Sequence, residues 1–178
     1  MDKLLHNFIY WIEKVNEQVG RAVSWLTSLL VILVCFDVIR RWLFNDTEAW
    51  IMELEWHLFA LVFLFGAGYT LKHDKHVRVD LFYASFSERD KAWVNLLGTL
   101  FFLLPWCVLI VIVSWGYGME SWSVKEGSPD PGGLPARYMI KFAIPIGISL
   151  LLLQGLAECA KAVLVLTKKS NSIKNNHL

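Results

Sequence analysis

The stretch AVSWLTSLLVILVCFDVI, residues 22–39, decides the fold, because it is almost wholly apolar over the length of a membrane-crossing helix. A bilayer core about 30 Å thick is spanned by about 20 mostly apolar residues in helical form. Three further runs of the chain meet the same criterion. The four predicted spans cover residues 22–39, 51–71, 93–115 and 142–160. We therefore expect an all-α integral membrane protein with four transmembrane helices.

The composition agrees with a lipid-facing protein. Apolar residues make up 56% of the 178 residues, whereas soluble domains contain roughly 45–50%. The net charge of +1 comes without a basic face that could hold phosphates, which excludes nucleic-acid binding. Cys35, Cys107 and Cys159 are too far apart for a closely spaced metal or redox pair. We interpret them as small apolar packing residues.

The two ends of the chain differ from the apolar middle, residues 22–166. In residues 1–21, apolar side chains recur at helical spacing opposite polar ones, which predicts an amphipathic helix on the cytoplasmic interface, ended at Gly20. The alternative is a helix packed on another protein. This start lacks the features of a cleavable signal peptide, so we expect the first span to remain as an anchor. Residues 167–178 are polar and predict a disordered tail.

The distribution of Lys and Arg predicts the orientation. Cytoplasmic segments of membrane proteins carry an excess of both residues. Twelve of the 17 lie in the N-terminal segment, the loop between the second and third spans, and the C-terminal segment. Five lie in the other two loops and their flanks. We therefore expect both termini in the cytoplasm and the loops near residues 40–50 and 116–138 outside.

Charged residues near the outer ends of the spans have structural explanations. Asp37 precedes Arg40 and Arg41 by three and four residues, so an ion pair within one helix can hold it. Glu53 and the neighbouring Glu55 and His57 open the second span at the outer interface. For these three we expect a solvated role or contact with a partner.

A polar stripe runs along the fourth span near its cytoplasmic end. Gln154, Glu158 and Lys161 are spaced by four and three residues and share one helix face. Such a stripe faces protein more often than lipid. We expect it to contact a partner subunit or the interior of the bundle.

The loop after the second span holds His73, His76 and Asp80, which could be considered as metal ligands. Interleaved basic residues would repel a divalent cation, so we favour a hydrogen-bonded loop that fastens the second helix to the third. Elsewhere no residues combine into a nucleophile, a base and oxyanion donors. We therefore expect no enzymatic activity, no metal and no cofactor.

The order of residues around the second span is specific. Trp50 and Glu53 open it, Gly66 lies in its middle, and Lys72 precedes the segment His76-Val77-Arg78-Val79-Asp80. This order resembles the small membrane subunit of tripartite ATP-independent periplasmic (TRAP) transporters. The Gly- and Pro-rich outer loop extends the resemblance, which covers all four spans.

The resemblance implies a function and partners. A TRAP transporter of the bacterial inner membrane imports a small organic acid with sodium. Its large membrane subunit carries the substrate and ion sites and forms a stable heterodimer with the small subunit. A periplasmic binding protein delivers the substrate and associates transiently. The small subunit is expected to be a scaffold against which the large subunit moves.

Two other functions remain as alternatives. A stand-alone small transporter needs polar groups near mid-membrane, whereas Asp37 and Glu53 lie towards the outer end. A membrane anchor of a haem-bearing redox complex needs two histidines on facing helices, and only His57 lies in a predicted span. The sequence does not identify a substrate.

Overall fold

The computed structural model describes residues 2–74, 83 and 85–175, and these residues form helices and loops without any strand. The helical segments are α1 (Asp2–Phe44), α2 (Ala49–Lys72), α4 (Glu88–Gly98), η1 (Thr99–Leu103), α5 (Leu104–Ser123) and α6 (Tyr138–Asn175). Four helices are long and apolar enough to cross a membrane: α1, α2, the continuous α4–η1–α5 segment, and α6. The prediction of an all-α protein with four such helices is confirmed.

The prediction of a separate amphipathic helix over residues 1–21 is wrong. α1 continues through Gly20 without a break, and the outward side of its first turns remains apolar at Leu4, Phe8 and Trp11. Gly20 allows a close contact between helices, because a Cβ atom there would lie 2.3 Å from the ring of Tyr69 on α2. At the other end, α6 continues as helix to Asn175, into the segment that we expected to be a disordered tail.

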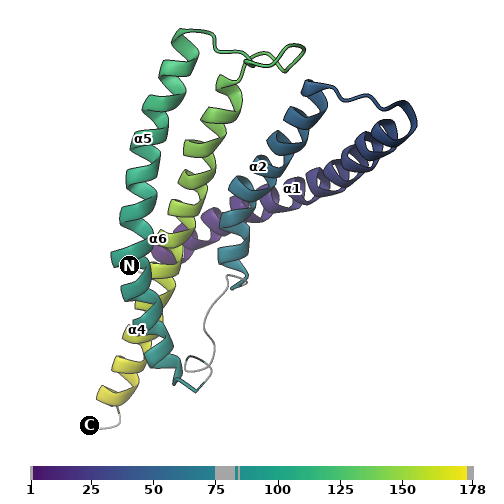
Figure 1. Ribbon diagram of the computed structural model, residues 1–178. Helices are drawn as coiled ribbons and strands as arrows, with labels where there is room; N and C mark the ends of the chain where they lie inside the picture. The colour runs from purple at the N-terminus through teal and green to yellow at the C-terminus, as the bar shows by residue number, and fades with distance from the viewer. Residues whose placement is uncertain (1, 75–82, 84, 176–178) are drawn as a thin grey trace.

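The helices form two pairs that diverge toward the loops after α1 and α5 (Figure 1). α2 and α6 lie at the centre of the molecule: α1 packs on both of them, and α5 packs on α6. The first turns of α1 cross α6, where Ile9, Ile12 and Ala157 form a buried apolar cluster. The two pairs therefore meet on the side of the N-terminus and separate on the opposite side.

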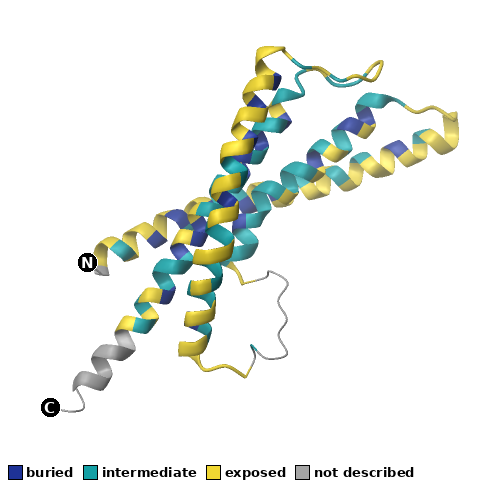
Figure 2. Cartoon of the chain, turned by 60° about the vertical axis from the view of Figure 1, so that its left-hand side comes forward, coloured by how far each residue is buried: buried dark blue, intermediate teal, exposed yellow. Residues whose placement is uncertain are grey.

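Unlike a soluble domain, the described helices expose many large apolar side chains and bury several polar ones; Figure 2 marks the exposed and buried positions. Large apolar residues such as Trp25 on α1 and Phe102 on η1 are exposed, whereas Asn16, Asp37 and Gln154 are buried. Lipid solvates apolar surfaces, and the polar groups therefore gather where other helices supply hydrogen bonds. This arrangement suits helices that cross a bilayer.

The third span contains one irregular turn, η1, which is a π-helical segment within an otherwise α-helical rod. Pro105 follows this turn. Proline has no N–H, and its ring crowds the carbonyl four residues earlier. The wider turn accommodates it, with the Leu104 N–H donating to the Thr99 carbonyl five residues back. The rod begins at Glu88, where the Ser87 hydroxyl caps it by accepting a hydrogen bond from the Asp90 N–H at 3.3 Å.

Candidate functional site

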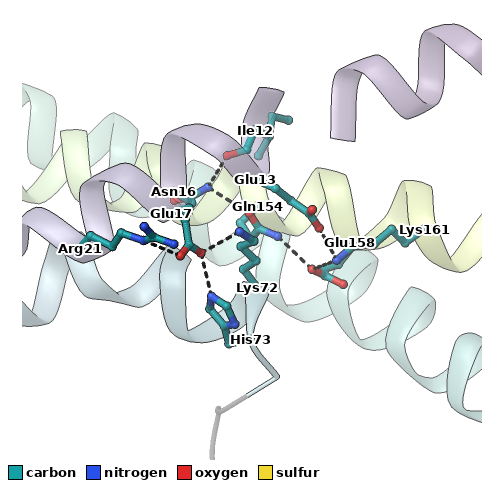
Figure 3. A network of polar contacts seen from close by, with 10 residues as sticks. All are labelled: Ile12, Glu13, Asn16, Glu17, Arg21, Lys72, His73, Gln154, Glu158 and Lys161. Carbon is teal, nitrogen blue, oxygen red and sulfur yellow. Dashed lines mark hydrogen bonds and ion pairs between the residues drawn. The ribbon is translucent and has the colours of Figure 1, made fainter. Parts of the chain in front are cut away.

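An inner polar network joins α1, α2 and α6 where they cross (Figure 3). At its centre, the Asn16 side-chain amide donates to the Gln154 amide oxygen at 3.0 Å and to the Ile12 carbonyl at 3.3 Å. Asn16 is 1% exposed and Gln154 is fully buried. Gln154 in turn donates to Glu158 at 2.9 Å. Buried amides are costly unless they are paired, so this pair specifies how α1 and α6 cross.

A carboxylate on α1 binds the end of α2. Glu17 accepts hydrogen bonds from Lys72 at 2.8 Å and from His73 at 2.9 Å. Arg21, one turn further along α1, donates to the same carboxylate at 2.9 Å (Figure 3). Lys72, one of the residues in the TRAP-like pattern, therefore lies in a contact between α1 and α2 within the chain.

The remaining part of the inner polar network links α1 to α6. Lys161 forms ion pairs with Glu13 at 2.8 Å and with Glu158 at 2.6 Å. Gln154 and Lys161 thus contact α1, and Glu158 bonds to both of them along α6 (Figure 3). Of the two contacts expected for this stripe, the structure shows the one inside the bundle. Contact with a partner stays a prediction.

α2 contains two glycines with different surroundings. A Cβ atom on Gly68 would lie 2.2 Å from the Asn16 side-chain oxygen, so the inner polar network depends on the missing side chain. A Cβ atom on Gly66 would have no other atom within 4 Å. Gly66, which belongs to the TRAP-like pattern, therefore faces open space within this chain.

Charged side chains also order the outer ends of α1 and α2. Asp37, 2% exposed, pairs with Arg41 as predicted. Arg40, the other predicted partner, instead binds Asp46 and Glu48 in the α1–α2 loop, each at 2.7 Å. The hydrogen bond from Arg40 lowers the pKa of the Glu48 carboxyl below its ordinary value. The same carboxylate accepts a hydrogen bond from the indole of Trp50, so this residue of the TRAP-like pattern binds the α1–α2 loop from the first turn of α2.

Glu53 binds the outer loop between α5 and α6. It is 5% exposed, and its carboxylate accepts hydrogen bonds from the Ser128 hydroxyl and from the Leu134 N–H, both at 2.5 Å. The expectation of a solvated Glu53 is therefore wrong, and its contact with a partner stays a prediction. The sequence did not indicate this contact, because Ser128 and Leu134 come within reach only through the fold of their loop.

Backbone hydrogen bonds give that loop its shape. The Ser128 N–H donates to the Leu134 carbonyl at 3.1 Å, and the Arg137 N–H donates to the Glu126 carbonyl at 2.9 Å. Glu126 also forms an ion pair with Lys141 at the start of α6, at 2.5 Å. This bond holds the pKa of the Glu126 carboxyl below its ordinary value. The loop is thus ordered by its own contacts and tied to α2 by Glu53.

Other predicted site residues are placed as follows. His76 and Asp80 lie outside the described residues, so the prediction of a structural loop there is untested. Glu55 and His57 lie one turn or less beyond Glu53 on α2, and the His57 ring contacts the Glu53 carbonyl at 2.5 Å. Among the described residues, no group of three or more His, Cys, Asp or Glu is arranged to hold a metal ion.

The described polar groups form contacts between helices and loops. Comparison with known proteins gives the family. The sequence model of the family described as "Tripartite ATP-independent periplasmic transporters, DctQ component" matches residues 30–164. The chain is also similar to the C4-dicarboxylate TRAP transporter small permease protein DctQ of Vibrio cholerae serotype O1. The two are 25% identical over 165 residues, which cover 79% of this chain and 71% of the relative.

Proposed function

Because this chain belongs to the family of DctQ components of tripartite ATP-independent periplasmic transporters, whose small permeases are non-enzymatic, we propose that it is the scaffold subunit of such a transporter. In this role it binds a large membrane subunit stably and a periplasmic binding protein transiently. The complex imports a small organic acid with sodium. The relative from Vibrio cholerae is named for C4-dicarboxylates, which makes succinate a reasonable first substrate to test.

One structural observation supports a scaffold more than a solute pathway. The buried polar groups Asn16 and Gln154 bind each other, and Glu53 binds the outer loop. Secondary transporters instead hold polar groups and broken helices near mid-membrane, where they can release and rebind solute. Here the polar groups serve contacts between helices and loops of the chain.

The chain leaves wide apolar surfaces for its partner. The outward faces of α1 and of the η1–α5 segment carry large exposed side chains, among them Ile32, Trp42, Phe101 and Ile112. We propose that part of this surface binds the large subunit, with Glu158 and Lys161 at its cytoplasmic edge. Trp50, Lys72 and the His76–Asp80 segment act structurally in this proposal, by keeping α1 and α2 and the following loop in place.

Reconstitution tests the scaffold role. In liposomes with a sodium gradient, the binding protein and succinate, we expect uptake only when this chain and the large subunit are both present. Uptake would be measured with radiolabelled succinate, and liposomes without a sodium gradient serve as the control. Uptake by this chain without the large subunit, or full uptake by the large subunit without this chain, would contradict the proposal.

The proposed orientation has both termini in the cytoplasm, because twelve of the 17 Lys and Arg lie on that side. We expect a cysteine at Gly127 to react with a membrane-impermeant maleimide in intact spheroplasts, in a background without native cysteines. A cysteine at Ser172 should react only after the membrane is opened. The reverse labelling pattern would show that the topology is inverted.

A further inference from the structure

An outer cleft of about 430 Å³ opens between α2 and the α5–α6 pair, where the two pairs of helices diverge (Figure 1). Its inner wall is apolar and is formed by Ala60 and Leu64 of α2 and Ile140 and Ile144 of α6. Trp56 and Tyr117 also line it, and both are aromatic residues of the kind that prefers the boundary between lipid and water. The outer cleft therefore has an apolar wall bordered by aromatic side chains.

The polar rim of the outer cleft contains two cations and one anion, Arg137, Lys141 and Glu126. Lys141 forms an ion pair with Glu126 at 2.5 Å, and its ammonium group lies 3.9 Å from the centre of the Tyr117 ring. Arg137 lies 5.7 Å from the centre of the Trp56 ring. Together with Lys141, which has the larger effect, it lowers the pKa of the Glu126 carboxyl. A planar guanidinium is suited to two oxygens of a phosphate group.

The chemistry of the outer cleft favours a lipid over a helix of a partner. Its lining combines an apolar wall with cations and aromatic side chains at one end, which matches an acyl chain joined to a phosphate headgroup. An acyl chain is much narrower than a helix and matches the wall formed by Ala60, Leu64 and Ile144.

We propose that the outer cleft binds one phospholipid of the leaflet next to the α5–α6 loop. The phosphodiester lies beside the Arg137 guanidinium, and one acyl chain lies along Ala60 and Leu64. The lining ionisable groups sum to one positive charge, which favours an anionic headgroup. This inference rests on the membrane placement of the four helices and is independent of the proposed role in transport.

Photo-crosslinking tests the site. The probe is phosphatidylglycerol with a diazirine in one acyl chain, added to the full-length chain in detergent, alone and assembled with the large subunit. We expect crosslinked peptides from residues 56–64 and 137–147 in both preparations. Crosslinking elsewhere, or replacement of these adducts by a peptide of the large subunit in the assembly, would overturn the proposal.

Competition experiments distinguish the contribution of the headgroup to binding from that of the acyl chains. Unlabelled phosphatidylglycerol should displace the probe about tenfold better than diacylglycerol, which has the same chains without the phosphodiester, since a charge-assisted hydrogen bond contributes about 1.5–3 kcal/mol. sn-Glycerol 3-phosphate, which has no chains, should not displace it. Equal competition by diacylglycerol would exclude the phosphodiester contact. Displacement by sn-glycerol 3-phosphate would indicate a site for soluble phosphates instead.

Two variants and a control complete the test. Arg137→Gln should lower the affinity for phosphatidylglycerol about tenfold and remove its advantage over diacylglycerol. Ala60→Leu should weaken binding of both lipids by filling the wall of the outer cleft. Lys125→Gln is the matched control, since Lys125 is a cation of the same loop that lies over the Trp122 ring, outside the cleft. Equal losses in Arg137→Gln and Lys125→Gln would contradict the assignment, and the competition on the unmodified chain decides the matter if a variant does not fold.

Discussion

Gly68→Ala is expected to lower the free energy of unfolding by about 2 kcal/mol, although alanine is the better helix former. The added Cβ atom would lie 2.2 Å from the Asn16 oxygen and 3.3 Å from the Leu150 carbonyl oxygen. Asn16 would have to move away from Gln154, which would leave two buried amides without their shared hydrogen bond. The measurement is unfolding of the purified chain in mixed detergent micelles with increasing sodium dodecyl sulfate.

The same helix supplies a control for Gly68→Ala. Gly66→Ala places a methyl group in open space, so it should leave stability unchanged or raise it by up to about 1 kcal/mol. Adding Asn16→Ala to Gly68→Ala removes the colliding oxygen. The double variant should therefore be less destabilised than the sum of the two single variants. Additive losses, or equal effects of Gly66→Ala and Gly68→Ala, would show that this contact does not set the helix crossing.

Glu53→Ala is expected to release the α5–α6 loop from α2. The carboxylate accepts two hydrogen bonds from the loop, at Ser128 and Leu134, and hydrogen bonds to a charged group contribute about 1.5–3 kcal/mol each. Amide hydrogen exchange gives a direct readout, because the Leu134 N–H loses its acceptor. We expect its exchange to accelerate at least tenfold, and succinate uptake by the reconstituted transporter to fall.

Glu120→Ala is the matched control for Glu53→Ala, since Glu120 is an exposed acid near the end of α5. It should leave the exchange of the Leu134 N–H unchanged. Glu53→Gln provides an intermediate case, because the amide keeps one oxygen acceptor but presents an N–H₂ group to a second donor. Unchanged protection of Leu134 in Glu53→Ala would show that the backbone bonds of the loop suffice without α2.

The sequence predicted the four helices because each span depends on a local property, the apolar run, which lipid selects directly. The ion pair between Asp37 and Arg41 was equally local, one helical turn apart. The contacts of Glu53 were not predictable in this way, since the two donors lie 75 and 81 residues away. Their positions depend on the turn that the loop adopts around Gly133.

The N-terminal segment shows a second limit of sequence patterns. Ile9 and Ile12 recur at helical spacing, which predicts a helix with one apolar side, but spacing does not say whether that side meets lipid or protein. In the structure this side packs against Ala157 of α6. Gly20 looked like a helix end, whereas it serves a close contact with Tyr69. The pairing of Asn16 with Gln154, 138 residues apart, likewise required the tertiary structure.

The length of α1 has a mechanical consequence for the surrounding lipid. Its 43 residues extend about 65 Å, more than twice the apolar thickness of a bilayer, and the helix lies obliquely to α5 and α6 (Figure 1). Its N-terminal half is held to α6 by Asn16 and to α2 by Glu17, and Arg40 binds the loop that leads into α2. These contacts oppose a change in the tilt of α1 relative to α2 and α6, which is one of the ways in which a helix relieves hydrophobic mismatch. We therefore expect the surrounding lipids to take up part of the mismatch by stretching or compressing.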